Sequence, residues 1–275
     1  KTLNIALAGT GVGKSLFMCH VASSCLLQGR NVLYITCEMA EEKIAERIDA
    51  NLLDIPIQQL QDPLLTKQKY RAKIDVLKKK TQGKLVIKEY PTASAHVGHF
   101  KALLNELSLK KGFHPEIIFV DYLNICASSR YKGTIVNSYT YVKAIAEELR
   151  GLAGEYNVPI LSATQTTRSG YGNSNVEITD TSESFGLPAT ADLMFALIST
   201  EDMEELNQIM VKQLKNRYND PTVYKRFVLG IDRQKMRLYD CDQNAQQDII
   251  DSGIEPNQFN PPKANPAKQF DDFKI

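Results

Sequence analysis

The stretch Ala8-Gly9-Thr10-Gly11-Val12-Gly13-Lys14-Ser15 decides the fold of this 275-residue chain. It matches the phosphate-binding pattern G-x-x-x-x-G-K-[ST], except that Ala8 replaces the first glycine. Its glycines let successive backbone N–H groups turn toward phosphate oxygens, and the helical pattern that follows adds an N-terminal dipole. Lys14 is expected to reach the β- and γ-phosphates, and the Ser15 hydroxyl to bind Mg²⁺. We therefore predict that ATP, or another nucleoside triphosphate, binds at Gly9, Thr10, Gly11, Val12, Gly13, Lys14 and Ser15.

Around this loop, apolar runs of strand length alternate with helical patterns. The expected strands are 3–8, 31–36, 85–89, 116–121, 158–163, 192–199, 208–214, 224–231 and 236–241. The expected helices are 14–28, 40–53, 66–80, 96–110 and 137–156. The alternation through residue 163 predicts an α/β fold with a mainly parallel, doubly wound sheet. The last three strands follow one another without a helix, which predicts an antiparallel C-terminal extension.

The composition restricts the class of protein. The chain is 43% hydrophobic and 24% charged, as is typical of globular proteins, so wholesale disorder is excluded. Its net charge of +1 means that any nucleic-acid site must be local. No apolar run approaches the roughly 18 residues that a membrane-spanning helix needs, so no membrane partner is expected. Five cysteines without a C-x-x-C pair argue against a disulfide framework or zinc ribbon and favour the reducing cytoplasm.

The two ends of the chain differ in character. Lys1 stands immediately before the first core strand, so we expect the chain to be a piece of a longer protein. From Gln243 onward the sequence is rich in Asn, Gln, Asp and Pro, a composition that buries too little surface to offset the entropy of ordering. We therefore predict one domain over residues 1–243 and a flexible tail over 244–275.

A second carboxylate completes the expected nucleotide site. Four apolar residues end in Asp121, the form of a Walker B strand that brings a carboxylate to the magnesium ion. The next residue is Tyr122, whereas many ATPases place a water-activating Glu there. Strand 31–36 runs into Glu38, and the carboxyl ends of neighbouring parallel strands meet at one edge of a sheet. Glu38 is therefore the candidate general base that orients the attacking water.

These motifs together resemble the RecA-like core of DnaB-type replicative DNA helicases over about residues 2–241. The similar segments are Glu38-Met39, Asp121-Tyr122-Leu123, the strand ending in Gln165 with Arg168 after it, Glu183-Ser184 followed by Ala191-Asp192, and Lys215-Asn216-Arg217. Three stretches are most similar to the helicases of T4-like bacteriophages, namely 49–51, 137–140 and 186–192. If the protein is encoded by a phage, the expected location is the host cytoplasm.

The resemblance implies a hexameric ring that hydrolyses nucleotide at subunit interfaces and pulls single-stranded DNA through its channel. It implies that Gln165 senses the γ-phosphate, that Arg217 is an arginine finger reaching the neighbour's nucleotide, and that Lys215 acts beside it. An arginine supplied by a neighbour stabilises the charge on the transferring phosphoryl group, an effect of about 10³–10⁵ in rate. Lys215 and Arg217 are two apart at the end of an expected strand, so both would point to one face.

The expected DNA contacts lie in loops. The loop after strand 116–121 carries Arg130 and Lys132, and the loop after strand 158–163 carries Arg168. By resemblance, the segment at Glu183 and Ser184 also lies near the DNA backbone. Here Ser182 stands where many relatives carry Arg, which weakens the phosphate contact expected from that segment. Backbone-only contacts suit a motor that must move along any sequence.

Other readings share parts of this pattern. A RecA- or RadA-type recombinase uses the same core to form filaments on DNA. A nucleotide-gated DNA-binding scaffold would need no positioned base, so Glu38 argues against it. A small-molecule kinase would need clustered arginines in a lid, and the stretch after Asp121 offers only Arg130. For a helicase, a primase and a helicase loader are further expected partners.

Overall fold

The structure is a computed structural model, and it describes residues 1–60, 67–131, 136–166, 176–180 and 186–241. In this part of the chain the strands form one nine-stranded sheet in the order β3-β2-β4-β5-β1-β6-β7-β8-β9. The strands are β1 (Leu3–Ala8), β2 (Val32–Thr36), β3 (Leu85–Glu89), β4 (Ile117–Asp121), β5 (Ile160–Gln165), β6 (Leu193–Ile198), β7 (Gln208–Asn216), β8 (Arg226–Asp232) and β9 (Arg237–Asp240). The first six are parallel, and β7, β8 and β9 pair antiparallel. The predicted α/β fold with an antiparallel C-terminal extension is confirmed.

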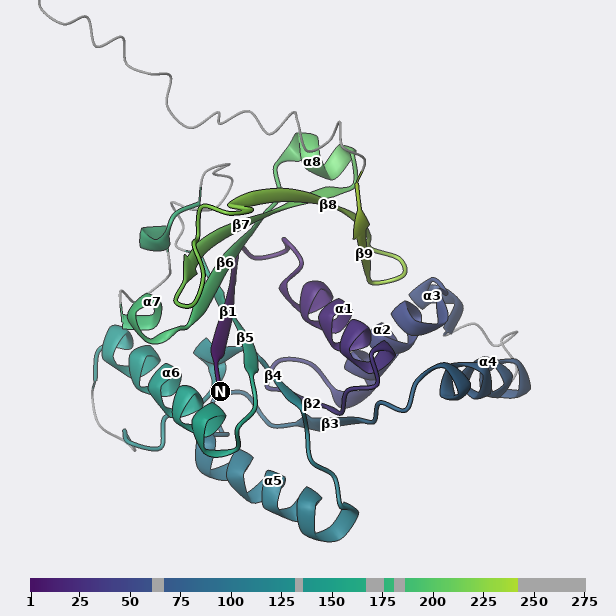
Figure 1. Ribbon diagram of the computed structural model, residues 1–275, viewed down its shortest axis with the longest axis horizontal. Helices are drawn as coiled ribbons and strands as arrows, with labels where there is room; N and C mark the ends of the chain where they lie inside the picture. The colour runs from purple at the N-terminus through teal and green to yellow at the C-terminus, as the bar shows by residue number, and fades with distance from the viewer. Residues whose placement is uncertain (61–66, 132–135, 167–175, 181–185, 242–275) are drawn as a thin grey trace, which may run out of the picture.

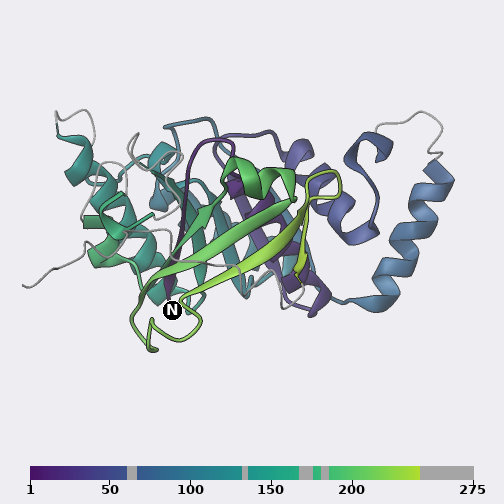
Figure 2. The same cartoon turned by 90° about the horizontal axis from the view of Figure 1, so that it is seen from above.

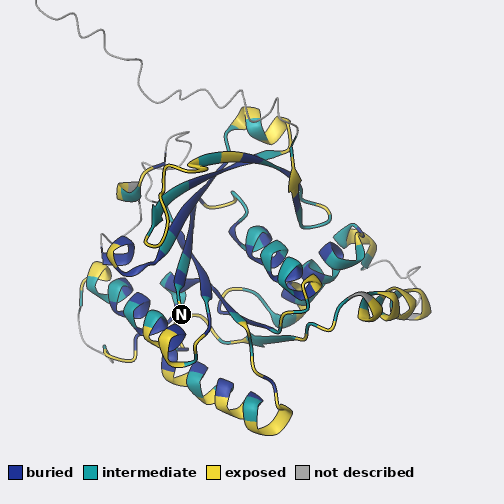
Figure 3. Cartoon of the chain, in the orientation of Figure 1, coloured by how far each residue is buried: buried dark blue, intermediate teal, exposed yellow. Residues whose placement is uncertain are grey.

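Helices cover both faces of the parallel strands (Figure 1). α1 (Lys14–Leu27) and α2 (Glu41–Leu53) lie on one face, and α5 (Val97–Lys111) and α6 (Ser138–Glu155) lie on the other. Adjacent residues of a strand contribute to opposite cores: in β2, Leu33 and Ile35 pack with α5 and α6, whereas Val32 and Tyr34 pack with α1 and α2. This alternation follows from the two-residue period of a strand. Because both faces are covered, the central strands β1, β2, β4, β5 and β6 are mostly apolar and buried, whereas the edge strand β3 is half-buried (Figure 3).

The remaining helices are peripheral or short. α4 (Lys67–Lys80) lies at the opposite extremity of the molecule from α6 (Figure 2). α3 (Ile57–Leu60), α7 (Gly186–Thr190), α8 (Glu201–Glu205) and the 3-10 turns η1 (Leu123–Ile125) and η3 (Ile178–Asp180) were not expected from the sequence. They span a turn or little more, which is too short to produce a helical period. None of the described helices is long and apolar enough to cross a membrane.

One strand boundary corrects the sequence-based expectation and matters for the site. β5 spans Ile160–Gln165 rather than 158–163, because its pairing with β1 begins at Leu3 opposite Ile160 and ends at Ala8 opposite Gln165. Gln165 is thus the last residue of the strand, level with the start of the phosphate loop.

The topology separates two edges of the sheet. The carboxyl ends of β1, β2, β4 and β5 lead into the phosphate loop, Glu38, Asp121 and Gln165. β7 runs the other way, and its pairing of Asn216 with Leu193 places Lys215 and Arg217 at the amino ends of the parallel strands. The six residues of β1 span roughly 20 Å at about 3.3 Å per residue, so Arg217 lies about that far from the phosphate loop of its own chain.

Candidate nucleotide site

The phosphate loop is a turn between β1 and α1 that requires glycine at two positions. Gly11 has φ 82° and Gly13 has φ 118°, both in the left-handed region that disfavours residues with a Cβ atom. Gly13 is the N-cap of α1, so the helix begins at Lys14 and its first N–H groups have no partner within the helix and no capping side chain among the described residues. The loop therefore has the backbone that anion binding at a helix N-terminus requires.

Lys14 points back over this loop. Its Nζ atom lies 3.4 Å from the Gly9 carbonyl oxygen and 5.8 Å from the centroid of the Tyr122 ring. Burial lowers the pKa of Lys14, and the nearby charges of Glu38 and Asp121 oppose this shift. A buried ammonium group beside the phosphate loop is placed to pair with the negative charge of a phosphate group.

Asp121 is fully buried, and only one of its two carboxylate oxygens accepts a hydrogen bond from a described residue. Its Oδ2 atom accepts a 2.8 Å hydrogen bond from the Tyr34 hydroxyl, whereas Oδ1 has no hydrogen-bond partner among the described residues. Burial raises the pKa of Asp121; Tyr34 and the neighbouring Ser15 hydroxyl oppose this rise, but Ser15 makes no hydrogen bond of normal geometry to Oδ1. An unpartnered buried carboxylate oxygen beside a hydroxyl fits the oxygen ligands that Mg²⁺ prefers.

Glu38 and Gln165 complete this edge. Glu38 lies two residues beyond the end of β2 and is exposed, and its charge acts on both Lys14 and Tyr122. Gln165 donates a 3.1 Å hydrogen bond from Nε2 to the Tyr122 hydroxyl. The fold therefore gathers four of the predicted nucleotide-site residues, Lys14, Glu38, Asp121 and Gln165, around the phosphate loop. Sequence reasoning missed two tyrosines in this cluster, Tyr34 and Tyr122, because an aromatic residue in or after an apolar strand reads as core.

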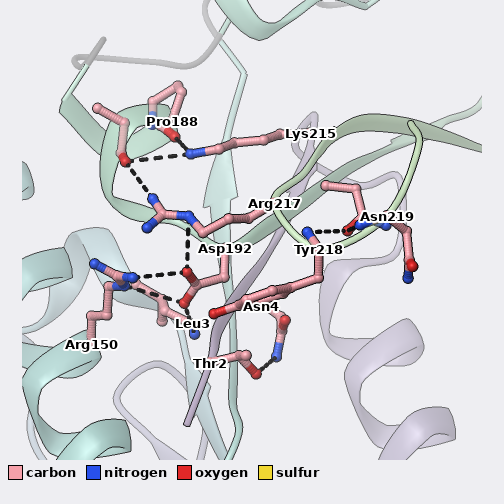
Figure 4. Close-up of polar contacts among 12 residues, drawn as sticks. Thr2, Leu3, Asn4, Arg150, Pro188, Asp192, Lys215, Arg217, Tyr218 and Asn219 are labelled. Carbon is pink, nitrogen blue, oxygen red and sulfur yellow. Dashed lines mark hydrogen bonds and ion pairs between the residues drawn. The ribbon is translucent and has the colours of Figure 1, made fainter. Parts of the chain in front are cut away.

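The other predicted catalytic residues lie at the opposite edge of the sheet (Figure 4). The Lys215 Nζ atom donates to the carbonyl oxygens of Pro188 at 2.6 Å and Ala189 at 3.3 Å. The Arg217 Nη2 atom donates to the same Ala189 carbonyl at 3.2 Å. The two side chains thus meet at the Ala189 carbonyl, although β7 ends at Asn216 and Arg217 lies one residue beyond it.

A buried carboxylate, Asp192, to which sequence reasoning assigned no role, anchors this edge. Arg150, on α6, binds both oxygens of Asp192 at 3.0 and 3.2 Å, and the Arg217 Nε atom lies 3.2 Å from Oδ1. Burial alone would raise the pKa of Asp192, but the hydrogen bonds from Arg150 and the Leu3 N–H, with the charge of Arg217, hold it below its ordinary value. Arg150 left no sequence signal, because it lies on a helix 42 residues before its partner.

Of the predicted DNA contacts, only Arg130 lies within the described residues. Its guanidinium group binds Glu147 on α6 and lies 4.0 Å from the buried Glu148. Its DNA contact stays a prediction, and its charge is shared with these carboxylates. Lys132, Arg168, Glu183 and Ser184 lie outside the described residues, as does the predicted tail over 244–275.

Comparison with known proteins identifies the family. The profile described as "DnaB-like helicase C terminal domain" matches residues 1–226. The chain belongs to this family. A DnaB-like replicative helicase of Enterobacteria phage T4 is 45% identical over 245 residues, which are 89% of this chain and 52% of the phage protein. The replicative DNA helicase DnaB of Helicobacter pylori is 26% identical over 200 residues, which are 71% of this chain and 39% of that protein.

The same fold is found among solved structures. A solved ATPase domain matches with a TM-score of 0.72 at 17% identity, covering 88% of this chain and 85% of that one. A structure described as "The Structure Of A DnaB-Like Replicative Helicase And Its Interactions With Primase" matches with a TM-score of 0.72 at 16% identity, covering 88% and 57%. The predicted RecA-like core and the resemblance to DnaB-type and T4-like helicases are confirmed.

The family match favours a helicase domain over the recombinase, scaffold and kinase readings. The chain spans about half the length of the curated relatives that it matches.

Proposed function

We propose that this DnaB-like domain is the motor of an ATP-dependent replicative DNA helicase that hydrolyses nucleotide at the interfaces between subunits. The observation that carries the proposal is the separation of the two halves of the site within one chain. Lys14, Glu38 and Asp121 lie at the carboxyl edge of the sheet, and Arg217 lies at the amino edge. A chain cannot deliver Arg217 to its own phosphate loop, so a second copy must supply it.

Magnesium and ATP fit the carboxyl edge. Ser15 and Asp121 would hold the ion, directly or through water, since the Oδ1 atom of Asp121 is buried without a described partner. A bound Mg²⁺ ion neutralises charge on the β- and γ-phosphates of the nucleotide. The loop N–H groups would bind the phosphate oxygens, and Lys14 would pair with the β- and γ-phosphates in place of its present contact with Gly9.

The residues around the γ-phosphate have distinct tasks in this proposal. Glu38 accepts a proton from the attacking water and orients it in line with the bond to be broken. Gln165 contacts the γ-phosphate and, through its hydrogen bond to Tyr122, reports its presence at the phosphate loop. Arg217 of the next copy stabilises the charge that spreads over the transferring phosphoryl group, and Lys215 acts beside it.

The assembly and its partners follow from the same arrangement. A head-to-tail interface repeated around an axis can close into a ring, and we propose a hexamer that passes single-stranded DNA through its centre.

The proposed DNA contacts are Arg130, Lys132, Arg168, Glu183 and Ser184. A primase and a helicase loader are proposed partners, and the host cytoplasm is the proposed location. The motor domain would span residues 1–243, followed by a tail over 244–275.

The test is steady-state ATP hydrolysis as a function of protein concentration, with and without single-stranded DNA, for the wild type and for Arg217→Ala. We expect the specific activity to rise with concentration, to be stimulated by DNA, and to fall about 10³-fold or more in the variant. Activity that is proportional to protein, independent of DNA and unchanged in Arg217→Ala would contradict the proposal and favour a self-contained nucleotide switch.

A further inference from the structure

Asp192 stands out because it is a single carboxylate surrounded by three cations. Its side chain has no exposed surface, whereas the side chains of Arg150 and Arg217 are 39% and 36% exposed. Lys215 is the third cation, and its pKa is lowered by burial and by the charges of the two arginines. Among the described residues, no second carboxylate contacts these cations at this point, so the cluster carries a surplus of positive charge at the surface.

Arg150 and one backbone N–H satisfy both oxygens of the Asp192 carboxylate without Arg217. The Nε and Nη2 atoms of Arg150 bind one oxygen each, the bidentate geometry that makes arginine–carboxylate pairs strong. The Leu3 N–H donates a further hydrogen bond to Oδ2 at 3.0 Å. The charge of Asp192 is therefore already balanced without Arg217. A purely structural ion pair would need only one arginine, so the second must be explained by another task.

Arg217 is held at both its main chain and its side chain. Its backbone N–H donates to the Asp192 carbonyl at 2.9 Å, its Nε atom faces Asp192 Oδ1, and its Nη2 atom donates to Ala189. These contacts fix the plane of the guanidinium group and engage the donors at Nε and Nη2. No described residue accepts a hydrogen bond from Nη1, which leaves donors for an acceptor outside the chain (Figure 4).

We propose that Asp192 is a positioning residue for Arg217: the buried carboxylate, neutralised by Arg150, fixes the orientation in which Arg217 is presented to the nucleotide of the neighbouring subunit. This inference rests on the proposed function, in which Arg217 acts across the interface. Arg150 prevents Asp192 from neutralising Arg217, so the guanidinium group keeps its charge for the phosphate. Asp192 touches no nucleotide itself and acts only through Arg217.

The experiment uses Asp192→Asn in the longest polypeptide that carries this chain, assembled with single-stranded DNA. Asparagine keeps the shape of the side chain and removes its charge. We expect kcat for ATP hydrolysis to fall about 10- to 100-fold, as misplacement of a catalytic group by a fraction of an ångström does, with little change in KM for ATP. Glu116→Gln is the matched control, because Glu116 also pairs with an arginine, Arg30, at the amino edge of the sheet but contacts neither Arg217 nor Asp192.

Two further measurements separate positioning from a loss of stability. In a double-mutant cycle, Asp192→Asn should have no further effect in an Arg217→Ala background, with residual rates followed by release of radiolabelled phosphate. Mixing Asp192→Asn with Lys14→Ala subunits should restore activity, because Lys14→Ala subunits supply a correctly held Arg217 to the intact phosphate loop of the other variant. The milder Arg150→Lys should give a smaller loss of kcat with the same recovery on mixing.

The outcomes distinguish the inference from the proposed function. If Arg217→Ala is as active as the wild type, the interfacial role of Arg217 fails, and with it the basis of the inference. If Arg217→Ala is inactive but Asp192→Asn stays within twofold of the wild type, only the positioning role is overturned. Equal losses in both backgrounds, or no recovery in mixed rings, would also overturn it, since they indicate a structural defect.

Discussion

Two buried aspartates, one at each edge of the sheet, are held in opposite ways. Asp121, at the carboxyl edge, has one hydrogen-bond donor from a side chain and one oxygen without a described partner, and burial raises its pKa. Asp192, at the amino edge, receives hydrogen bonds or ion pairs from two arginines and a backbone N–H, and its pKa is lowered. Among the described residues, Asp121 forms no ion pair, whereas Asp192 forms ion pairs with two arginines.

Neither edge of the sheet carries all of the residues proposed to act on the nucleotide. The carboxyl edge carries the phosphate loop, Lys14 and the carboxylates, and the amino edge carries Lys215 and Arg217. In the proposed function, two copies placed head to tail would bring the two sets of residues together at one interface. Within one chain the edges stay roughly 20 Å apart, because the strands between them are rigid and buried.

The largest effect is expected from separating the two edges onto different subunits. Lys14→Ala and Arg217→Ala should each reduce ATP hydrolysis about 10³-fold or more on its own, since each removes charge stabilisation of the transferring phosphoryl group. Mixed in one ring, they should regain activity at interfaces that pair the intact phosphate loop of one with Arg217 of the other. The doubly substituted protein, mixed with either variant, is the control and should restore nothing. Mixed rings that form, as seen by native mass spectrometry, but stay inactive would show that the two edges do not meet.

Glu38→Gln tests the proposed general base at the carboxyl edge of the sheet. Loss of the proposed general base should lower kcat by about 10²–10⁴-fold while the nucleotide still binds, because Glu38 is not among the proposed phosphate or Mg²⁺ ligands. The measurement is kcat together with the equilibrium binding of a fluorescent ATP analogue. Glu42→Gln, on the exposed first turn of α2, is a matched control that should retain activity. A Glu38→Gln protein with wild-type kcat would remove Glu38 from the mechanism.

Stability should respond in opposite directions at the two aspartates. Asp192→Asn should lower the free energy of unfolding by about 3 kcal/mol, because it leaves the arginine contacts of a buried carboxylate unpaired. Asp121→Asn removes a poorly compensated buried charge and should change stability by no more than about 1 kcal/mol, toward greater stability. Urea unfolding at pH 7, followed by far-UV circular dichroism because the chain has no Trp, measures both. A destabilised Asp121→Asn protein would contradict the comparison.

The pH dependence provides an internal check on Asp192. Its pKa is lower in the folded than in the unfolded chain, so its contribution to stability is complete above the ordinary value of 3.8 and is lost as the pH falls through the folded value. The difference in unfolding free energy between the wild type and Asp192→Asn should therefore be constant near neutrality and shrink below about pH 4. A constant difference down to the acid limit of folding would show that the charge of Asp192 contributes nothing.

The smallest effect is expected at Tyr122, which links Gln165 to the phosphate loop. Tyr122→Phe removes one neutral hydrogen bond, a loss of about 0.5–1.5 kcal/mol, and should lower the DNA-stimulated rate about two- to tenfold. The basal rate without DNA should change less, because the ring that lies over Lys14 is kept. Tyr139→Phe, on an exposed tyrosine of α6, is the control. Equal losses with and without DNA would assign Tyr122 to packing alone.

Much of the fold was predictable because the signals are local. The loop 8–15 and the apolar strand ending at Asp121 carry their own backbone requirements in consecutive residues, and α2 follows its four-residue spacing. The end of β5 was misplaced by two residues, because register with β1 depends on a partner more than 150 residues away. The short helices α7 and α8 left no periodic signal.

The sequence by itself determined the class of chemistry. A glycine-rich loop, a lysine, a hydroxyl and two carboxylates at strand ends have few uses other than a phosphate group and its metal ion. Only the tertiary structure decided which groups meet. The reversal of β7 carried Lys215 and Arg217 to the edge opposite the phosphate loop, and the packing of α6 brought Arg150 to Asp192. Those contacts join residues far apart in the chain, and their energies depend on burial and distance, which no local pattern of residues encodes.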